Sequence, residues 1–128
     1  MKKKFLYRKI IFHISNIGLV LIYLYPGSIF GWLLYGNIKK QPQLTSDFAI
    51  FSSNHVYTFM ALSVLGYISY KNQKLNFLFI YLLSISVFLE ILHIIIPNRG
   101  FEFTDLFGNI LGVLIVYFFH QTYNYFYN

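Results

Sequence analysis

Ionisable and amide side chains are embedded in two long apolar stretches of the second half of the chain. Glu90 and His93 lie in the first stretch, Asp105 and Asn109 lie in the second, and Arg99 stands between them. A carboxylate is expensive inside a bilayer, so an intramembrane acid marks a functional site by default. An acid beside a histidine can transfer protons, and an arginine can hold a phosphate or carboxylate through paired hydrogen bonds. We therefore expect the chemistry of this protein to lie between Glu90 and Asn109.

The spacing of these residues predicts that they share one depth in the membrane. Glu90 and His93 are three positions apart, which places them on one helix face. If their helix leaves the membrane near Ile96, Glu90 lies about 9 Å below the exit, at about 1.5 Å per residue. Asp105 begins the next apolar stretch from the same side, and His55 opens an earlier one from that side too. We expect all these groups in the outer third of the bilayer.

Each of these residues also has a structural interpretation. Glu90 can pair with Arg99 or be protonated and hydrogen-bonded. Asp105 or Thr104 is well placed as the N-cap of the last helix. His55 and His93 can be packing histidines near the headgroups. These alternatives remain open for each residue alone, and the shared depth favours a common site.

Several further residues favour structural roles only. Gly108 and Gly112 have the Gly-x-x-x-Gly spacing that is typical of a close contact between membrane helices. His13, Asn16 and His120 lie toward the opposite ends of their stretches, where we expect packing, hydrogen bonds between helices or a favourable position at a helix C-terminus.

The composition indicates a membrane protein. The 128 residues are 57% hydrophobic and only 11% charged, with a mean hydropathy of +0.57. Soluble domains carry about 25% charged residues, so lipid must solvate much of this surface. We expect one membrane domain over residues 1–128. The net charge of +6 then suits anionic lipid headgroups and membrane orientation, not nucleic acid. Cysteine is absent, which excludes disulfides, thiolate metal sites and a cysteine nucleophile.

The apolar segments predict an all-α, polytopic helical bundle. They span about 10–25, 55–70, 75–96 and 105–123, so we expect about four transmembrane helices. No alternation with a period of two is present, and helices satisfy their backbone groups within lipid. We expect the first segment to be a retained signal anchor. The connection 28–53 contains apolar residues and is either re-entrant or interfacial.

The basic residues predict the orientation of the bundle. Most of them flank the first segment or lie between the second and third: Lys2, Lys3, Lys4, Arg8, Lys9, Lys71 and Lys74. Lys39, Lys40 and Arg99 lie on the other side. The positive-inside rule therefore places both termini in the cytoplasm and exposes 27–54 and 97–104 on the outside.

The second half of the chain resembles the VanZ-like family of small bacterial integral membrane proteins. The resemblance covers about residues 50–119 and rests on Asn54-His55 with Phe59 and Leu62, then Glu90-x-x-His93, Pro97-x-Arg99, Asp105, Asn109 and Gly112. The family usually has Gln at the position of His93, and often a basic residue just before the histidine, where this chain has Ser53-Asn54. The family is named for a teicoplanin-resistance protein, and related domains appear beside cell-envelope and polysaccharide genes.

The resemblance implies a multi-pass protein of the bacterial cytoplasmic membrane with one shared polar site. We expect this outward-facing site to bind or modify an anionic envelope lipid or glycopeptide-type ligand, and to contribute to glycopeptide (teicoplanin) resistance. The candidate catalytic residues are Glu90, His55 and Asp105. The candidate ligand-binding residues are Arg99, Asn109 and His93. Whether the protein is an enzyme stays open.

The alternative is a non-enzymatic membrane scaffold or accessory subunit whose polar network stabilises helix packing. A metal site is a further hypothesis, because Glu-x-x-His can supply two ligands from one helix turn and His55 and Asp105 can complete the set. The usual Gln of the resembling family at position 93 argues against it, so we expect neither a metal nor a cofactor. Membrane lipids are the expected partners, and the oligomeric state is open. Proton-coupled transport ranks lower, because no charged path leads to the cytoplasmic side.

Overall fold

The computed structural model describes residues 2–71 and 75–127 as a set of helices; Lys74, used above for the orientation, lies outside them. The helices are α1 (Lys2–Leu24), α2 (Ile29–Tyr35), α3 (Ser53–Ser69), α4 (Leu75–Leu92) and α5 (Phe103–Tyr127). The described residues form no strand, and a single isolated bridge joins Phe48 to Phe51. The predicted all-α bundle is therefore confirmed.

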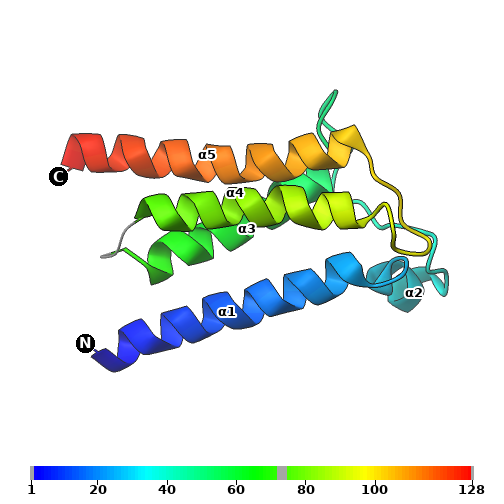
Figure 1. The fold of residues 1–128 in the computed structure, drawn as a ribbon, viewed down its shortest axis with the longest axis horizontal. Coiled ribbons are helices and arrows are strands. Elements are labelled where there is room, and N and C mark those ends of the chain that lie inside the picture. Colours follow the sequence, from blue (N-terminus) through cyan, green and yellow to red (C-terminus); the bar gives the residue numbers. More distant parts are fainter. Residues whose placement is uncertain (1, 72–74, 128) are drawn as a thin grey trace.

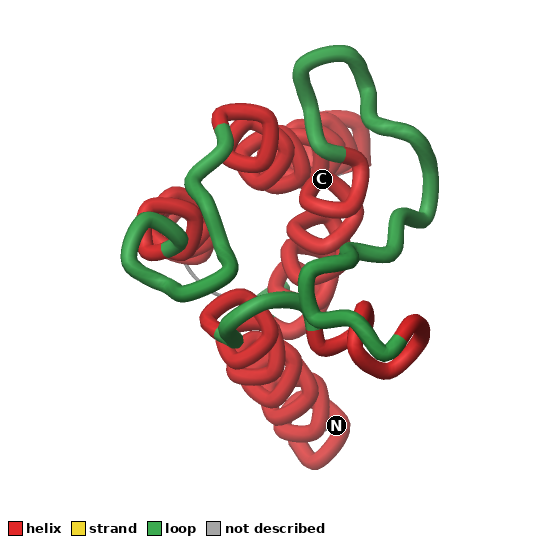
Figure 2. The backbone as a smooth tube through the Cα atoms, turned by 90° about the vertical axis from the view of Figure 1, so that its right-hand side faces the viewer, coloured by secondary structure: helices red, strands yellow, loops and turns green. Residues whose placement is uncertain are grey.

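The four long helices run side by side, and the irregular segments gather at one end (Figure 1). Both chain ends lie at the opposite end of the bundle. Figure 2 looks at the end that carries α2 and the connections 36–52 and 93–102. Among the described elements, α3 and α4 each contact the other three long helices, and the most extensive contact is the one between α3 and α5. Residues at the N-terminal ends of α3 and α5 and at the C-terminal ends of α1 and α4 consequently meet at the end with the loops.

Three helices are long and apolar enough to cross a membrane: Leu6–Leu24, Leu75–Leu92 and Phe103–Tyr127. At most 28% of the residues in each segment are buried within the protein, so much of their apolar surface needs lipid around it. α3 has 17 residues, which gives a length of about 25 Å at 1.5 Å per residue. The four-span topology and the cytoplasmic termini remain predictions.

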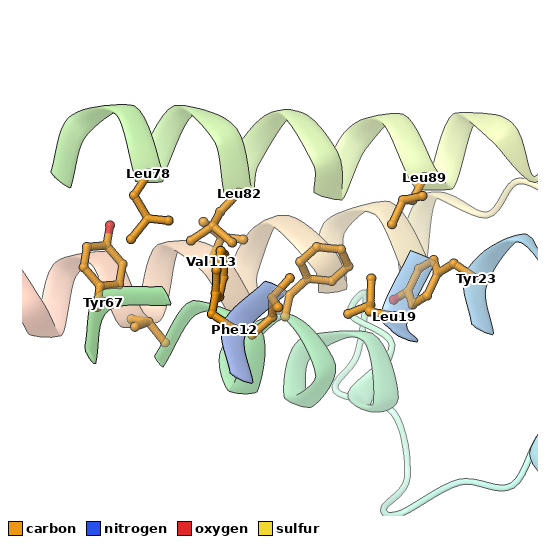
Figure 3. Close-up of a cluster of buried hydrophobic side chains, with 11 residues drawn as sticks. Phe12, Leu19, Tyr23, Tyr67, Leu78, Leu82, Leu89 and Val113 are labelled. Atoms are coloured by element: carbon orange, nitrogen blue, oxygen red, sulfur yellow. The ribbon is translucent and has the colours of Figure 1, made fainter. Parts of the chain in front are cut away.

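The core lies along the axis of the bundle and draws side chains from every long helix. Phe12 of α1, Phe59 of α3, Leu82 of α4 and Val113 of α5 are each at most 2% exposed. Figure 3 shows Phe12, Leu82 and Val113 close together, with Leu89 nearer the loops. This apolar packing holds the helices in the register that sets the positions of the polar residues beyond it.

Close approach of α3 to α5 depends on two glycines one turn apart. A Cβ at Gly108 would lie 2.7 Å from the carbonyl oxygen of Ser52, and one at Gly112 would lie 2.5 Å from that of Val56. Real Cβ atoms do not come so near a backbone oxygen, so only glycine permits this helix spacing. The predicted role of Gly108 and Gly112 as a helix contact is confirmed.

The end of α4 differs from the prediction. The sequence predicts a helix as far as Ile96, but α4 ends at Leu92. The backbone N–H of His93 donates to the carbonyl of Glu90 at 3.1 Å, and the next residues continue with similar i→i+3 turns. Glu90 is thus two residues from the end of α4, whereas the predicted helix places it six residues from the end. Hydropathy alone does not register this turn, because the turn residues Ile94 and Ile95 are themselves apolar.

The connection between α1 and α3 contains a short helix that the sequence does not resolve. Gly27 follows α1 with a φ of +101°, a conformation that favours glycine. Ser28 then caps α2, because its Oγ accepts a hydrogen bond from the N–H of Gly31 at 2.9 Å. Trp32 and Leu33 of α2 are more than half exposed. Such an apolar helix at the end of the bundle suits an interfacial position, while the choice between interfacial and re-entrant remains a prediction.

We predict that Gly112→Ala destabilises the protein by about 1–3 kcal/mol, because the added methyl group must push α3 away from α5. Thermal unfolding of the purified protein in detergent measures this effect. Gly18→Ala is the matched control, since a Cβ at Gly18 meets no atom within 4 Å and alanine favours the helix. Equal melting temperatures for the Gly112→Ala variant and the native protein would contradict the packing argument.

Candidate functional site

Polar side chains from four helices meet at the end of the bundle that carries the loops. His55 comes from α3, Glu90 from α4, and Asp105 and Asn109 from α5, while Tyr23 joins them from α1. Glu90 and Asn109 are fully buried, at 0% exposure, whereas Asp105 is partly exposed. The residues that the sequence groups into one site therefore lie together in space.

Asn109 fixes the orientation of His55. Its amide Nδ2 donates to the carbonyl oxygen of Ser86 at 3.2 Å, so its Oδ1 points to the other side. There Oδ1 accepts a hydrogen bond from the Tyr23 hydroxyl at 2.9 Å and lies 2.9 Å from His55 Nδ1. An amide oxygen can only accept, so the network assigns a proton to His55 Nδ1.

His93 is oriented in the same way by α1. Its Nε2 lies 3.0 Å from the carbonyl oxygen of Tyr23, and the two rings are stacked with centroids 5.6 Å apart. Because a carbonyl oxygen accepts only, the network assigns a proton to Nε2. The predicted ligand-binding role of His93 is untested, but its ring links α1 to Glu90.

Two histidine nitrogens are left facing carboxylate oxygens. His55 Nε2 lies 3.4 Å from Asp105 Oδ2, and His93 Nδ1 lies 3.3 Å from Glu90 Oε2. If both rings are neutral, these nitrogens carry lone pairs that face the lone pairs of the carboxylates. Each pair therefore needs a positive charge between its atoms, from a proton or from a bound cation. This arrangement can store and transfer protons or hold a cation.

The carboxylate of Glu90 is only half satisfied. Its Oε1 accepts a hydrogen bond from the backbone N–H of Glu102 at 3.2 Å. Its Oε2 is buried and has no hydrogen-bond partner among the described residues. Buried polar atoms almost always have a partner, so Oε2 is expected to bind a proton, a ligand or an ion.

Asp105 lies in the first turn of α5, which begins at Phe103. The interpretation of Asp105 as the N-cap of this helix is therefore wrong. Its carboxylate faces His55, as the ion-pair distance shows. The negative charge also lies at the positive end of the α5 dipole, which stabilises it there.

Arg99 stabilises the end of α1 through hydrogen bonds. Its Nη2 donates to the carbonyl of Ile22 at 3.1 Å and its Nε to that of Tyr25 at 3.4 Å, so it caps the C-terminus of α1. Among the described residues Arg99 forms no ion pair with an acid, so the interpretation in which it pairs with Glu90 is wrong. Burial lowers the pKa of Arg99 from its usual range, and the nearby Tyr23, Glu90 and Asp105 oppose that shift.

Two adjoining pockets open beside these residues. The first has a volume of about 590 Å³ and lies between α1, α2, α3 and the segment 41–44, with a largely apolar lining that includes Gly18, Leu19, Ile22, Phe30 and Leu34. The second has a volume of about 290 Å³ and a polar lining that includes Lys39, Asp47, Ser52, His93, Glu102 and Asp105. Asn54, His55 and Arg99 line both pockets. An apolar space and a polar space therefore share one wall.

Tyr23 and Ser86 are members of the site that sequence reasoning missed. Tyr23 contacts both histidines and Asn109, and Ser86 accepts from Asn109 through its backbone carbonyl. Tyr23 is one of twelve tyrosines, and no spacing links α1 to the later motifs. A backbone carbonyl leaves no trace in the sequence at all.

We predict that Tyr23→Phe lowers the stability of the protein by about 1–2 kcal/mol, because the buried Asn109 Oδ1 and His55 Nδ1 lose a partner. Thermal unfolding in detergent measures the change. Tyr25→Phe provides the control, since Tyr25 is 40% exposed and its hydroxyl forms no hydrogen bond with a described residue. If both variants unfold at the same temperature as the native protein, the Tyr23 hydroxyl does not support the network.

No family model, no curated protein and no solved structure matches this chain. The resemblance to the VanZ-like family therefore remains a prediction from the sequence.

Proposed function

We propose that this chain is a multi-pass protein of the bacterial cytoplasmic membrane that binds an amphiphilic envelope ligand with an anionic headgroup at the outer surface. In this proposal α3 is the fourth span, both termini are cytoplasmic, and the end with the loops faces outward. The headgroup occupies the polar pocket and the apolar chain occupies the larger pocket.

The observation that carries the proposal is the shared wall of the two pockets. A ligand that fills both must be polar at one end and apolar at the other, as a lipid or a lipid-linked sugar phosphate is. The apolar pocket, at about 590 Å³, falls within the size range of small-molecule sites. Its wall on α1 belongs to a candidate membrane span, so a lipid can reach it from the bilayer.

The polar pocket offers groups for both binding and chemistry. Lys39 and Arg99 supply positive charge for an anionic headgroup. No described residue accepts a hydrogen bond from Arg99 Nη1, which leaves that donor for a ligand. His55 and Asp105 line this pocket and can transfer protons to or from the ligand, while Glu90 is buried 3.9 Å from His55 Nδ1.

The resemblance to the VanZ-like family supports an envelope context for this activity. In that context the ligand is an envelope lipid or a glycopeptide-type molecule, and occupation of the site contributes to teicoplanin resistance. This part of the proposal rests on the sequence pattern from Asn54 to Gly112 alone.

A structural role is the second candidate, and Arg99 is the observation that favours it. Both of its hydrogen bonds hold the end of α1, and Asn109 joins α1, α3 and α4. In this case the protein is a scaffold or accessory subunit, and the pockets have no specific occupant.

We predict that Gly18→Leu weakens binding of a polyprenyl phosphate by about tenfold or more, equivalent to at least ~1.4 kcal/mol. Gly18 lines the apolar pocket and a Cβ there meets no atom within 4 Å, so the leucine side chain extends into the space that the ligand chain would fill. Trp32 is the single tryptophan and lies on α2 between Phe30 and Leu34, which line the pocket, so its fluorescence in detergent micelles is used to follow binding. Teicoplanin susceptibility of a bacterium expressing each variant gives the cellular measurement.

Ile17→Phe is the matched control, because Ile17 is 60% exposed on the same helix and does not line the pocket. The uncharged polyprenol tests the contribution of the headgroup. Gly18→Leu should leave the melting temperature unchanged or raise it, since leucine favours a helix more than glycine does. A scaffold predicts the same fluorescence and the same susceptibility for the native chain and both variants.

We predict that a membrane-impermeant maleimide labels Ser46→Cys in intact cells but labels Tyr125→Cys only after the cells are permeabilised. The native chain has no cysteine, so each variant carries one reactive group. Ser46 is exposed in the connection between α2 and α3, and Tyr125 is 83% exposed near the end of α5. Labelling of Tyr125→Cys in intact cells, or its failure for Ser46→Cys, would reverse or reject the proposed orientation.

A further inference from the structure

Three potential metal ligands converge beside the polar pocket, which is lined by His55 and Asp105, with Glu90 buried next to them. One nitrogen of His55, one carboxylate oxygen of Glu90 and one of Asp105 all lie within 4.8 Å of one another. His55 Nε2 lies 3.4 Å from Asp105 Oδ2, and Glu90 Oε2 lies on the other side of the ring, 3.9 Å from Nδ1. Ligand atoms in a tetrahedral site with bonds of about 2.1 Å lie about 3.4 Å apart, so small side-chain movements complete a coordination shell.

An independent observation points to a positively charged ligand here. Glu90 is fully buried, and its Oε2 has no hydrogen-bond partner among the described residues. The hydrogen bond from the N–H of Glu102 to Oε1 holds the carboxylate so that Oε2 faces the histidines. A buried carboxylate oxygen with an open lone pair is a typical ligand position for a cation.

The hydrogen bonds around His55 orient its ring as a metal ligand. Metal-bound histidines nearly always donate their other ring N–H to an oxygen. Asn109 Oδ1 takes the N–H of His55 Nδ1, and Ser86 and Tyr23 hold Asn109 in place. This leaves the lone pair of His55 Nε2 directed toward Asp105.

The charges also balance for a divalent ion. Glu90 and Asp105 bring two negative charges, and the neutral forms of His55 and His93 bring none. One divalent cation bound by His55, Glu90 and Asp105 neutralises both carboxylates. A mixed set of imidazole and carboxylate ligands suits Zn²⁺ or Mn²⁺.

We propose that His55, Glu90 and Asp105 bind one divalent metal ion of the Zn²⁺ or Mn²⁺ class at the wall of the polar pocket. The remaining coordination positions face that pocket, where the ion attracts an anionic group. The sequence alone predicts no metal, on the basis of the residue at position 93. In the structure His93 is outside the set of converging ligands, so that argument does not apply to it.

Calorimetric titration of the full chain with ZnCl₂ or MnCl₂ tests the proposal. The protein is purified in detergent, treated with a chelator, and measured without lipid. We expect one ion per chain, with affinity at least about tenfold weaker for Glu90→Gln and for Asp105→Asn, which is ~1.4 kcal/mol. Glu102→Gln is the control, because Glu102 lines the same pocket but contributes only its backbone N–H to Glu90.

Failure of the native chain to bind either metal saturably overturns the proposal. So does a loss in Glu102→Gln equal to that in Glu90→Gln. A melting-temperature measurement with and without metal guards against misfolding: we expect metal to raise the melting temperature of the native chain and of Glu102→Gln, but not of Asp105→Asn, whose partly exposed position tolerates substitution. Since no lipid is present, these results are independent of the polyprenyl phosphate experiment with Gly18→Leu.

Discussion

The requirement that buried polar atoms find partners governs the end of this bundle. Asn109 is the centre of that constraint, because one amide satisfies groups from α1, α3 and α4 at once. It can do so only because Gly108 and Gly112 let α5 lie against α3. The helix contact and the polar network therefore depend on each other. The two glycines set the distance between α3 and α5, and at that distance the Asn109 amide can orient His55.

The same constraint separates groups that are satisfied from groups that are not. Arg99 donates hydrogen bonds to carbonyl oxygens at the end of α1, so its presence alone does not indicate a ligand. Glu90 Oε2 is buried and has no hydrogen-bond partner among the described residues. The neighbouring His93 ring donates its N–H to the carbonyl of Tyr23 instead. An unsatisfied acid among oriented histidines costs folding free energy, and proteins usually retain such groups where they act on a ligand.

Hydropathy in the sequence was sufficient to predict the long helices, and the residue types at their ends were sufficient to group His55, Glu90, Asp105 and Asn109. The physical reason is that polar residues in apolar helices must meet one another. Hydropathy could not predict the end of α4, because the turn after Leu92 contains isoleucines and is defined by backbone hydrogen bonds. It also could not predict that Arg99 binds carbonyls of α1, since any backbone carbonyl is equivalent in the sequence.

The contacts that α1 makes with the site have a thermodynamic consequence. The carbonyl of Tyr23 accepts from His93, and its hydroxyl donates to Asn109, so α1 is held partly by groups that also face the acids. The same helix forms one wall of the apolar pocket. Occupation of the polar cluster and the width of the apolar pocket are thus linked, and linkage is reciprocal. A ligand that shifts α1 at one position would therefore change the affinity at the other position.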